Sequence, residues 1–252
     1  MAALDETANA GDGRPSGPAE ARVALRRLSV AVYTFEGTDA AAPPVVLVHP
    51  NRTQGRVFDF VVAASAIGST FVSFDQRGHG HSDWPETGYA IDDYVGDLLA
   101  LLDALGHPRV VLVGQATGAL VALLAASRAS DRVAAVVAAQ PAMAIAPAVN
   151  DLVQGEVEAH RVLPDEAAAR AALPFSSRWR EEVVAHALET ALMPVAGGFT
   201  FRYHPPAVAE TEARLLEDFS DRLTATCPVL LFRGGDSTIV GPDDLARFAR
   251  AL

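Results

Sequence analysis

Short continuous apolar runs recur along the chain and alternate with amphipathic stretches. Five such runs stand out, at residues 44–49, 70–75, 109–114, 133–139 and 228–233. Runs of this length and apolar character predict strands that are buried on both faces, as in a parallel sheet. Residues 23–35 instead alternate apolar and polar side chains, which predicts an antiparallel pair at an edge of the sheet.

Apolar residues at helical spacing separate these runs. Between residues 92 and 105 they recur three or four positions apart, and Gly106 follows as a helix stop. Helices are also predicted at residues 58–67, 120–130 and 242–252. Strands that alternate with helices favour the α/β class, with a doubly wound, mainly parallel sheet.

The pattern changes after Pro141. Residues 147–219 show no strand pattern and hold several short amphipathic segments interrupted by prolines, so we expect a helical cap inserted into the sheet domain. Residues 23–146 and 220–252 then form the core, although its closing strand and helix appear absent from the sequence. Residues 1–22 are rich in Ala, Gly, Pro and acidic residues, which predicts a disordered N-terminal lead.

Composition narrows the range of partners. The net charge is −11, and all 20 basic residues are Arg, which argues against a nucleic acid or an anionic membrane surface as partner. Cys227 is the single cysteine, so an internal disulfide and a Cys-rich zinc module are excluded.

No secretory or transit signal precedes the core, so we expect a cytoplasmic protein that acts on a small molecule. The oligomeric state is left open.

The most informative motif lies where the third apolar run meets a helix. Residues 114–118 read GQATG, and a strand–turn–helix of the form G-x-S-x-G is a nucleophile elbow. The turn needs small residues at both ends because it is sharp and its central residue adopts a strained backbone. That central residue is Ala116, which carries no attacking group. A glycine-rich turn of any doubly wound fold is the alternative interpretation.

Three further segments, in chain order, define a resemblance. They are residues 45–52 (VVLVHPNR), residues 74–82 (FDQRGHGHS) and residues 228–236 (PVLLFRGGD). The second is similar to a D-x-R-G-x-G-x-S loop, and with residues 114–118 the set resembles the α/β-hydrolase superfamily. The resemblance spans residues 23–252. It implies the fold, the cap and cofactor-free hydrolysis of an ester, lactone or similar carbonyl compound through an acyl-enzyme.

The resemblance also assigns site positions. It places Ala116 at the nucleophile position and Asp236 at the position of the triad acid. The oxyanion donors fall on the backbone N–H groups of Asn51 and Thr117. His49 and Gln115 are two further candidate substrate-binding residues. One departure is Pro50, which stands where the family usually has Gly.

A second departure concerns the catalytic base. The resemblance implies a triad histidine after Asp236, but the last histidine is His204. The chain as it stands is therefore expected to be inactive as a serine hydrolase. Three explanations stay open: a substituted serine at position 116, a sequence that stops before the family's last strand, and a naturally nucleophile-less member. The last would be a small-molecule binding protein or a cofactor-free lyase.

Other chemistries are weighed on the same residues. Residues 79–83 match five positions of a H-x-H-x-D-H zinc motif, but Trp84 stands where the last histidine belongs. Gly78 and Gly80 lack the third glycine of a dinucleotide fingerprint. We therefore expect no metal and no cofactor. Thr117 as a substitute nucleophile is disfavoured, since its side chain should point away along the new helix.

Overall fold

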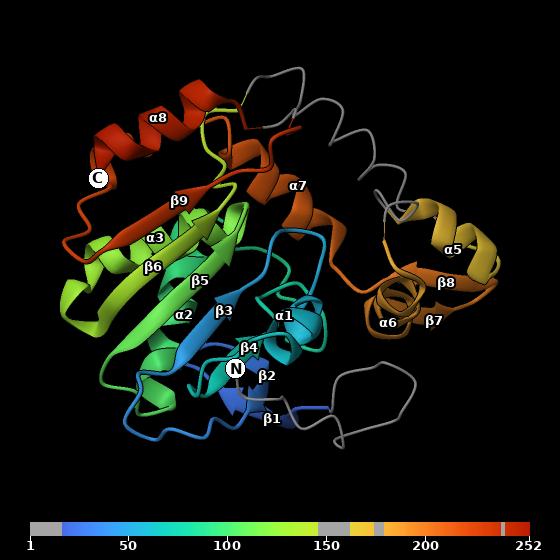
Figure 1. Ribbon diagram of the computed structural model, residues 1–252. Coiled ribbons are helices and arrows are strands. Elements are labelled where there is room, and N and C mark those ends of the chain that lie inside the picture. Colours follow the sequence, from blue (N-terminus) through green and yellow to red (C-terminus); the bar gives the residue numbers. More distant parts are fainter. Residues whose placement is uncertain (1–16, 146–161, 174–178, 238–239) are drawn as a thin grey trace.

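A seven-stranded sheet forms the centre of the computed structural model, which describes residues 17–145, 162–173, 179–237 and 240–252 (Figure 1). The strands are β1 (Ala19–Ala24), β2 (Ser29–Phe35), β3 (Val45–Val48), β4 (Phe71–Phe74), β5 (Val110–Gln115), β6 (Val133–Ala139) and β9 (Val229–Phe232). Their order across the sheet is β1-β2-β4-β3-β5-β6-β9. The five strands predicted from continuous apolar runs pair in parallel, and β1 and β2 form the predicted antiparallel edge.

The N-terminal boundary differs from the expectation. A disordered lead was predicted to reach residue 22, but β1 begins at Ala19 and pairs with β2 along its whole length. Residues 1–16 lie outside the described part of the chain. Polar and charged side chains on β1 hide its strand character, because an outermost strand exposes most of its residues.

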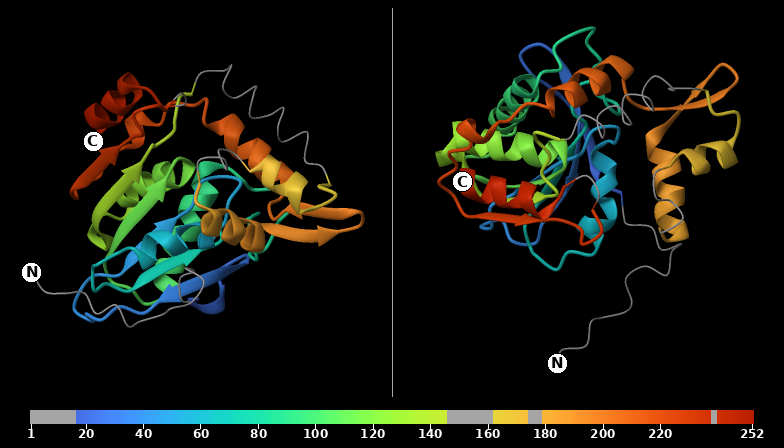
Figure 2. Two further views of the ribbon diagram at one scale, coloured as in Figure 1. Left: turned by 45° about the vertical axis from the view of Figure 1, so that its right-hand side comes forward. Right: turned by 90° about the horizontal axis from the view of Figure 1, so that it is seen from above.

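Helices lie where the apolar periodicity predicted them: α1 (Asp59–Ala63), α2 (Ile91–Ala104), α3 (Thr117–Arg128) and α8 (Pro242–Ala251). The short 3₁₀ helices η1 (Gly55–Phe58), η2 (Ser130–Arg132) and η4 (Ser220–Arg222) lie between the longer elements. The predicted helix at 58–67 is shorter, and its first turn is a 3₁₀ turn. Residues 117–126 of α3 are all buried, because α3 packs against both β5 and β6 of the sheet and against α2. Figure 2 gives two further views of these layers. No helix in the described ranges has the length and apolar character needed to cross a membrane.

The inserted segment projects from one side of the sheet (Figures 1 and 2). It contains α5 (Glu166–Ala172), α6 (Glu181–Ala191), β7 (Leu192–Val195), β8 (Gly198–Phe201) and α7 (Pro205–Arg214). The expectation that it holds no strand is wrong for residues 192–201, where β7 and β8 form an antiparallel hairpin. Gly197 and Gly198 allow the turn with φ of 88° and 148°. Residues 147–161 and 174–178 of the expected cap lie outside the described residues.

A buried ion pair anchors the loop that follows β4. Arg77 Nε and Nη2 each donate to a carboxylate oxygen of Asp97 at 2.6 Å, and Nη1 donates to Gly88 O at 2.6 Å. Desolvation raises the pKa of Asp97, while the guanidinium opposes this effect. Removing the Asp97 charge leaves the Arg77 guanidinium, in a poorly solvated place, with only the more distant Asp93 carboxylate, 3.7 Å from Nη1.

We therefore expect Asp97→Asn to lower the free energy of unfolding by about 3 kcal/mol, measured by urea denaturation. Asp103→Asn is the matched control on the same helix. It breaks an ion pair with Arg132 whose side chains are 28% and 67% exposed. That pair should contribute less than about 1 kcal/mol. Equal losses in the two variants would contradict the structural role of the Arg77–Asp97 pair.

Candidate active site

The turn between β5 and α3 has the geometry of a nucleophile elbow. Ala116 adopts φ of 49° and ψ of −115°, a conformation that costs a non-glycine residue about 1–3 kcal/mol. The turn is held by the Ala116 N–H, which donates to Ala139 O on β6 at 2.9 Å. The alanine side chain is half-buried at the position where the elbow presents its functional group.

Both glycines of the motif are required by close backbone approaches. A Cβ on Gly114 would lie 2.3 Å from Gly118 O, because the helix folds directly back over the strand. A Cβ on Gly118 would lie 2.2 Å from Val48 O and 2.6 Å from His49 O. The second contact joins the start of α3 to the carboxyl end of β3. The elbow and the loop after β3 are therefore neighbours.

The two predicted oxyanion donors belong to these neighbouring segments. Asn51 lies two residues beyond His49, and Thr117 lies one residue before Gly118. Across the described ranges, neither the Asn51 N–H nor the Thr117 N–H donates to another residue. Free N–H groups on adjacent segments are what an oxyanion site needs. The Thr117 side chain is 5% exposed, which leaves it little access as a substitute nucleophile.

His49 does not fit the predicted substrate-binding role. Its side chain is fully buried, and its Nε2 accepts the Gln76 N–H at 2.9 Å. The proton therefore lies on Nδ1, which donates to Pro50 O at 2.8 Å. Burial lowers the pKa of His49 to about 3, so the ring is neutral. His49 holds the loop after β3 in place and is not available as a base or as a substrate contact.

The structure adds a buried polar network that the sequence analysis missed. Glu212 of α7 accepts Arg52 Nε at 3.0 Å, Arg52 Nη2 at 3.1 Å and Asn51 Nδ2 at 3.2 Å. Asn51 Oδ1 lies 2.9 Å from His79 Nε2, so the loop after β4 joins the same network. Arg52 itself has a positive φ of 63°. Glu212 of the inserted segment thus contacts the loop that carries the candidate oxyanion donor.

The loop with the partial zinc motif is occupied by structural contacts. His79 Nδ1 lies 2.9 Å from Arg77 O, and its Nε2 lies 2.9 Å from Asn51 Oδ1 and 3.3 Å from Arg52 N. Burial lowers the pKa of His79 to about 4. Asp75 accepts the Gly55 and His81 N–H groups, each at 2.7 Å. Within the described residues, no group of three or more His, Cys, Asp or Glu side chains could hold a metal ion.

The two remaining candidate residues, Gln115 and Asp236, also lie at the carboxyl ends of the parallel strands. Asp236 is exposed in the turn after β9, two strands away from Ala116. Its neighbour Ser237 accepts Gln140 Nε2 at 2.9 Å, which ties this turn to the end of β6. Gln115 is exposed at the end of β5. The structure therefore brings Asn51, Thr117 and Ala116 together. It places Gln115 and Asp236 at the carboxyl ends of strands in the same sheet.

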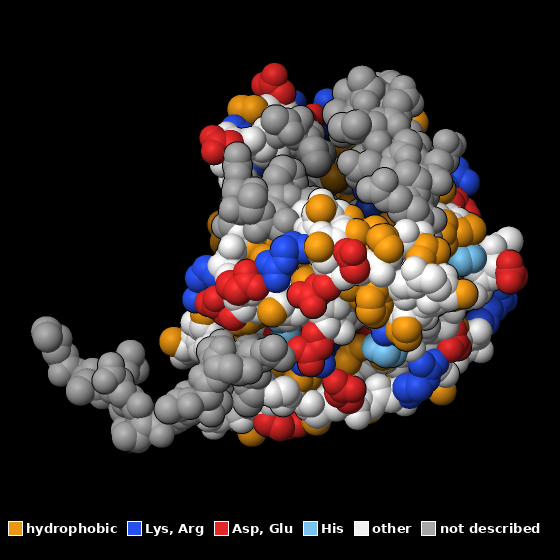
Figure 3. Space-filling model, turned by 90° about the vertical axis from the view of Figure 1, so that its right-hand side faces the viewer, with side chains coloured by type: hydrophobic (Ala, Val, Ile, Leu, Met, Phe, Trp, Pro, Cys, Tyr) orange, Lys and Arg blue, Asp and Glu red, His pale blue; other side chains and the backbone are white. Residues whose placement is uncertain are grey.

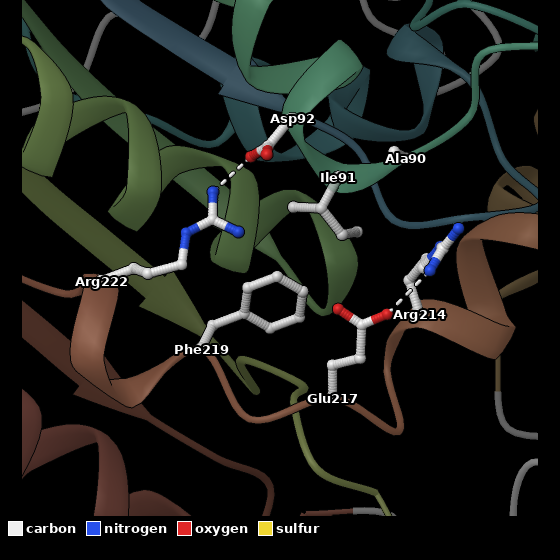
Figure 4. A pocket seen from close by; sticks show the side chains of 7 residues that line it. All are labelled: Ala90, Ile91, Asp92, Arg214, Glu217, Phe219 and Arg222. Atoms are coloured by element: carbon white, nitrogen blue, oxygen red, sulfur yellow. Dashed lines mark hydrogen bonds and ion pairs between the residues drawn. The ribbon is translucent and has the colours of Figure 1, made fainter.

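Two pockets lie away from Ala116. One, of about 240 Å³, lies between the start of α2 and the segment after α7, where Asp92 pairs with Arg222 and Glu217 with Arg214 (Figure 4). The other lies at the amino ends of the parallel strands. On the face that carries the cap, acidic, basic and apolar side chains are interspersed (Figure 3).

The fold and the elbow define a class of protein, and comparison with known proteins agrees. Residues 43–252 match the family model described as alpha/beta hydrolase fold, so the chain belongs to this family. A 2-(acetamidomethylene)succinate hydrolase from Mesorhizobium japonicum is 30% identical over 230 residues, which are 89% of this chain and 82% of that protein. An sn-1-specific diacylglycerol lipase from Mus musculus is 27% identical, with 90% and 76% covered.

Solved structures show the same relationship. A crystal structure of E-2-(acetamidomethylene)succinate hydrolase has a TM-score of 0.82 at 29% identity and covers 93% of this chain and 87% of that one. An enol-lactonase from Burkholderia xenovorans has a TM-score of 0.73 at 23% identity, with 92% and 87% covered. The second likeness supports the fold alone. The relatives are hydrolases, and the family resemblance inferred from the sequence is confirmed.

Proposed function

We propose that this chain carries the substrate-binding half of a carbonyl hydrolase site and does not form an acyl-enzyme as it stands. The observation that carries the proposal is Ala116, held in the strained elbow conformation with a methyl group where the nucleophile belongs. The substrate class is an ester, a lactone or an amide. The amide is included because a relative is named for hydrolysis of 2-(acetamidomethylene)succinate.

The mechanism follows from what the site can do. The Asn51 and Thr117 N–H groups would bind the carbonyl oxygen and stabilise developing negative charge there. Covalent catalysis also needs a base that takes the nucleophile's proton and returns it to the leaving group. His49 and His79 are buried, have depressed pKa values and use both ring nitrogens in contacts to the backbone. Neither residue can be that base.

The test is p-nitrophenyl acetate turnover by the chain and by Ala116→Ser. We expect a trace rate from the chain, because binding and the oxyanion donors alone give only about 10³–10⁴-fold over water. Ala116→Ser should gain little, since nucleophile and base act as a unit. Supplying a histidine on a C-terminal extension together with Ala116→Ser should restore far more than either change alone.

Asp236→Ala is the control for the acid position. In the doubly changed protein it should remove most of the restored rate. Brisk turnover by the unchanged chain that survives Asp236→Ala would contradict the proposal. It would point to other residues, and the loop of His79 and His81 would be the first to test.

A second candidate is favoured by the same backbone strain. The chain keeps the strained backbone of the elbow although Ala116 carries no nucleophile. This favours a family member that only binds a carbonyl compound, or that catalyses an elimination from it without a covalent intermediate. Calorimetric titration with 2-(acetamidomethylene)succinate, followed by product analysis, separates the two forms of this second candidate. Binding with no product supports a binding protein, and release of an elimination product supports a lyase.

A further inference from the structure

The side-chain amide of Asn51 is held at both of its ends. Its Nδ2 donates to Val208 O at 3.3 Å and to Glu212 Oε1 at 3.2 Å. Its Oδ1 lies 2.9 Å from His79 Nε2. Val208 and Glu212 are four residues apart on α7, so one face of this helix supplies both acceptors. The side chain of Asn51 therefore ties the backbone that carries the candidate oxyanion N–H to α7.

The next residue of the loop is attached to the same carboxylate. Arg52 donates from Nε to Glu212 Oε1 at 3.0 Å and from Nη2 to Glu212 Oε2 at 3.1 Å, which makes a bidentate ion pair. Glu212 is 6% exposed. Arg52 has a positive φ of 63°, a conformation that a non-glycine residue keeps only when its surroundings impose it. One buried carboxylate thus contacts two consecutive loop residues, and the second of them has a strained backbone.

The position of α7 does not depend on the ion pair of Glu212. Its neighbour Thr211 is 1% exposed, and Thr211 Oγ1 lies 2.9 Å from the hydroxyl oxygen of Tyr94 on α2. Thr211 also donates to Tyr89 O at 3.3 Å. Val208, one turn earlier on α7, is fully buried. These contacts hold α7 beside α2 whatever residue stands at position 212, so Glu212 is a carboxylate on a fixed support.

We propose that Glu212 is a positioning residue that orients the Asn51 N–H so that it binds a carbonyl oxygen together with the Thr117 N–H. This inference rests on the proposed function, because it takes these two N–H groups as the oxyanion site. Oxyanion donors are effective when they are oriented before the charge develops. Thr117 is oriented by the first turn of α3, whereas Asn51 lies in a turn outside any helix or strand. Asn51 is therefore the donor that needs support from elsewhere in the chain.

Glu212→Gln is the informative change, because it keeps the size of the side chain and removes its charge. One carboxylate oxygen becomes an –NH₂ group, so a donor then faces a donor of Arg52 or Asn51. α7 stays in place because the contacts of Thr211 remain. We therefore expect the loop to lose its attachment at Asn51 without loss of the fold.

The test follows the backbone amide resonances of Asn51 and Thr117 in nitrogen–proton correlation spectra of the whole chain. Sodium acetate is the probe, because a carboxylate oxygen is an acceptor that an oxyanion site binds, and sodium chloride at equal ionic strength is the reference. In the unchanged chain both resonances should move to lower field and saturate together. In Glu212→Gln the Asn51 response should be lost, the Thr117 response should remain, and the Kd for acetate should rise about tenfold.

Glu210→Gln is the matched control on the same helix. Among the described residues Glu210 has no hydrogen bond to the loop after β3, so this variant should keep both responses. A full Asn51 response in Glu212→Gln would overturn the inference and leave the proposed function standing. Equal loss of both responses would also overturn it, because Glu212 would then only stabilise the fold. If neither resonance responds in the unchanged chain, the oxyanion site is absent, and the proposed function and this inference fail together.

Arg52→Gln tests the same contact if Glu212→Gln fails to fold. It breaks the ion pair from the side of the loop and leaves α7 and its carboxylate unchanged. The Asn51 response to acetate should again weaken more than the Thr117 response. Equal responses of the two resonances in this variant would contradict the positioning role of the pair.

Discussion

Gly118→Ala is expected to destabilise the protein by about 3 kcal/mol or more, measured as the free energy of unfolding in urea. The new Cβ would lie 2.2 Å from Val48 O and 2.6 Å from His49 O. Both atoms are main-chain carbonyl oxygens at the end of a central strand, so neither can turn aside as a flexible side chain would. Relief of the clash requires α3 to move away from the end of β3.

Gly96→Ala is the matched control for this prediction. Gly96 lies inside α2, is exposed, and would place its Cβ in open space. The same chemical change there should stabilise the protein by about 0.5–1 kcal/mol, because alanine loses less entropy than glycine in a helix. If both variants lose stability to the same extent, close packing of β3 against α3 is not the reason for the glycine at 118.

Acidification is expected to unfold the protein through two of its buried histidines, His49 and His79. Burial lowers the pKa of His79 to about 4 and that of His49 to about 3, from an ordinary value of 6.5. As the pH falls below 6.5, the unfolded chain therefore binds protons that the folded chain does not. The stability contributed by each neutral ring is fully present above pH 6.5. As the pH falls from 6.5, this stability decreases by about 1.4 kcal/mol per pH unit for each histidine. The decrease continues to about pH 4 for His79 and to about pH 3 for His49.

His79→Gln isolates one of these contributions. Burial also raises the pKa of Asp75 and Asp97, and their effect on stability has the opposite sign. The informative quantity is therefore the difference in slope between variant and wild type. Between pH 6 and 4.5 this variant should lower the slope of unfolding free energy against pH by about 1.4 kcal/mol per unit. Val95→Ala, a buried change without a titrating group, should lower stability and leave the slope unchanged.

The sequence predicted the central strands well because β3 and β4 are buried at every position and β5 and β6 are largely buried. Within the run 109–114, residues 110–113 are all apolar, and the observed strand, Val110–Gln115, is shifted by one residue at each end. The β7–β8 hairpin was missed because Pro194 and the Gly197–Gly198 turn interrupt any alternating pattern. Only two strands pair there, so no wider sheet imposes a regular pattern on them.

The candidate site was predictable where the backbone itself forms it. The two glycines around Ala116 can be recognised in the sequence, because the sharp turn requires them whatever the structure of the rest of the chain. The contact between Arg52 and Glu212 leaves none, since the two residues are 160 positions apart and Glu212 resembles any polar position on an amphipathic helix. His49 was misassigned for the opposite reason. Its sequence position suggests chemistry, but complete burial removes it from any substrate.

The contact of Glu212 with the loop after β3 bears on how this family diversifies. A cap can be exchanged for another by recombination without disturbing the sheet, provided that the loop carrying the oxyanion donor keeps its support. Here that support comes from the cap itself, through Glu212 to Asn51 and Arg52. A chimera that imports a foreign cap must therefore bring an acidic residue to this place on its last helix, or replace Arg52 as well. Otherwise Arg52, whose side chain is 20% exposed, loses its ion pair with the cap helix beside the candidate site.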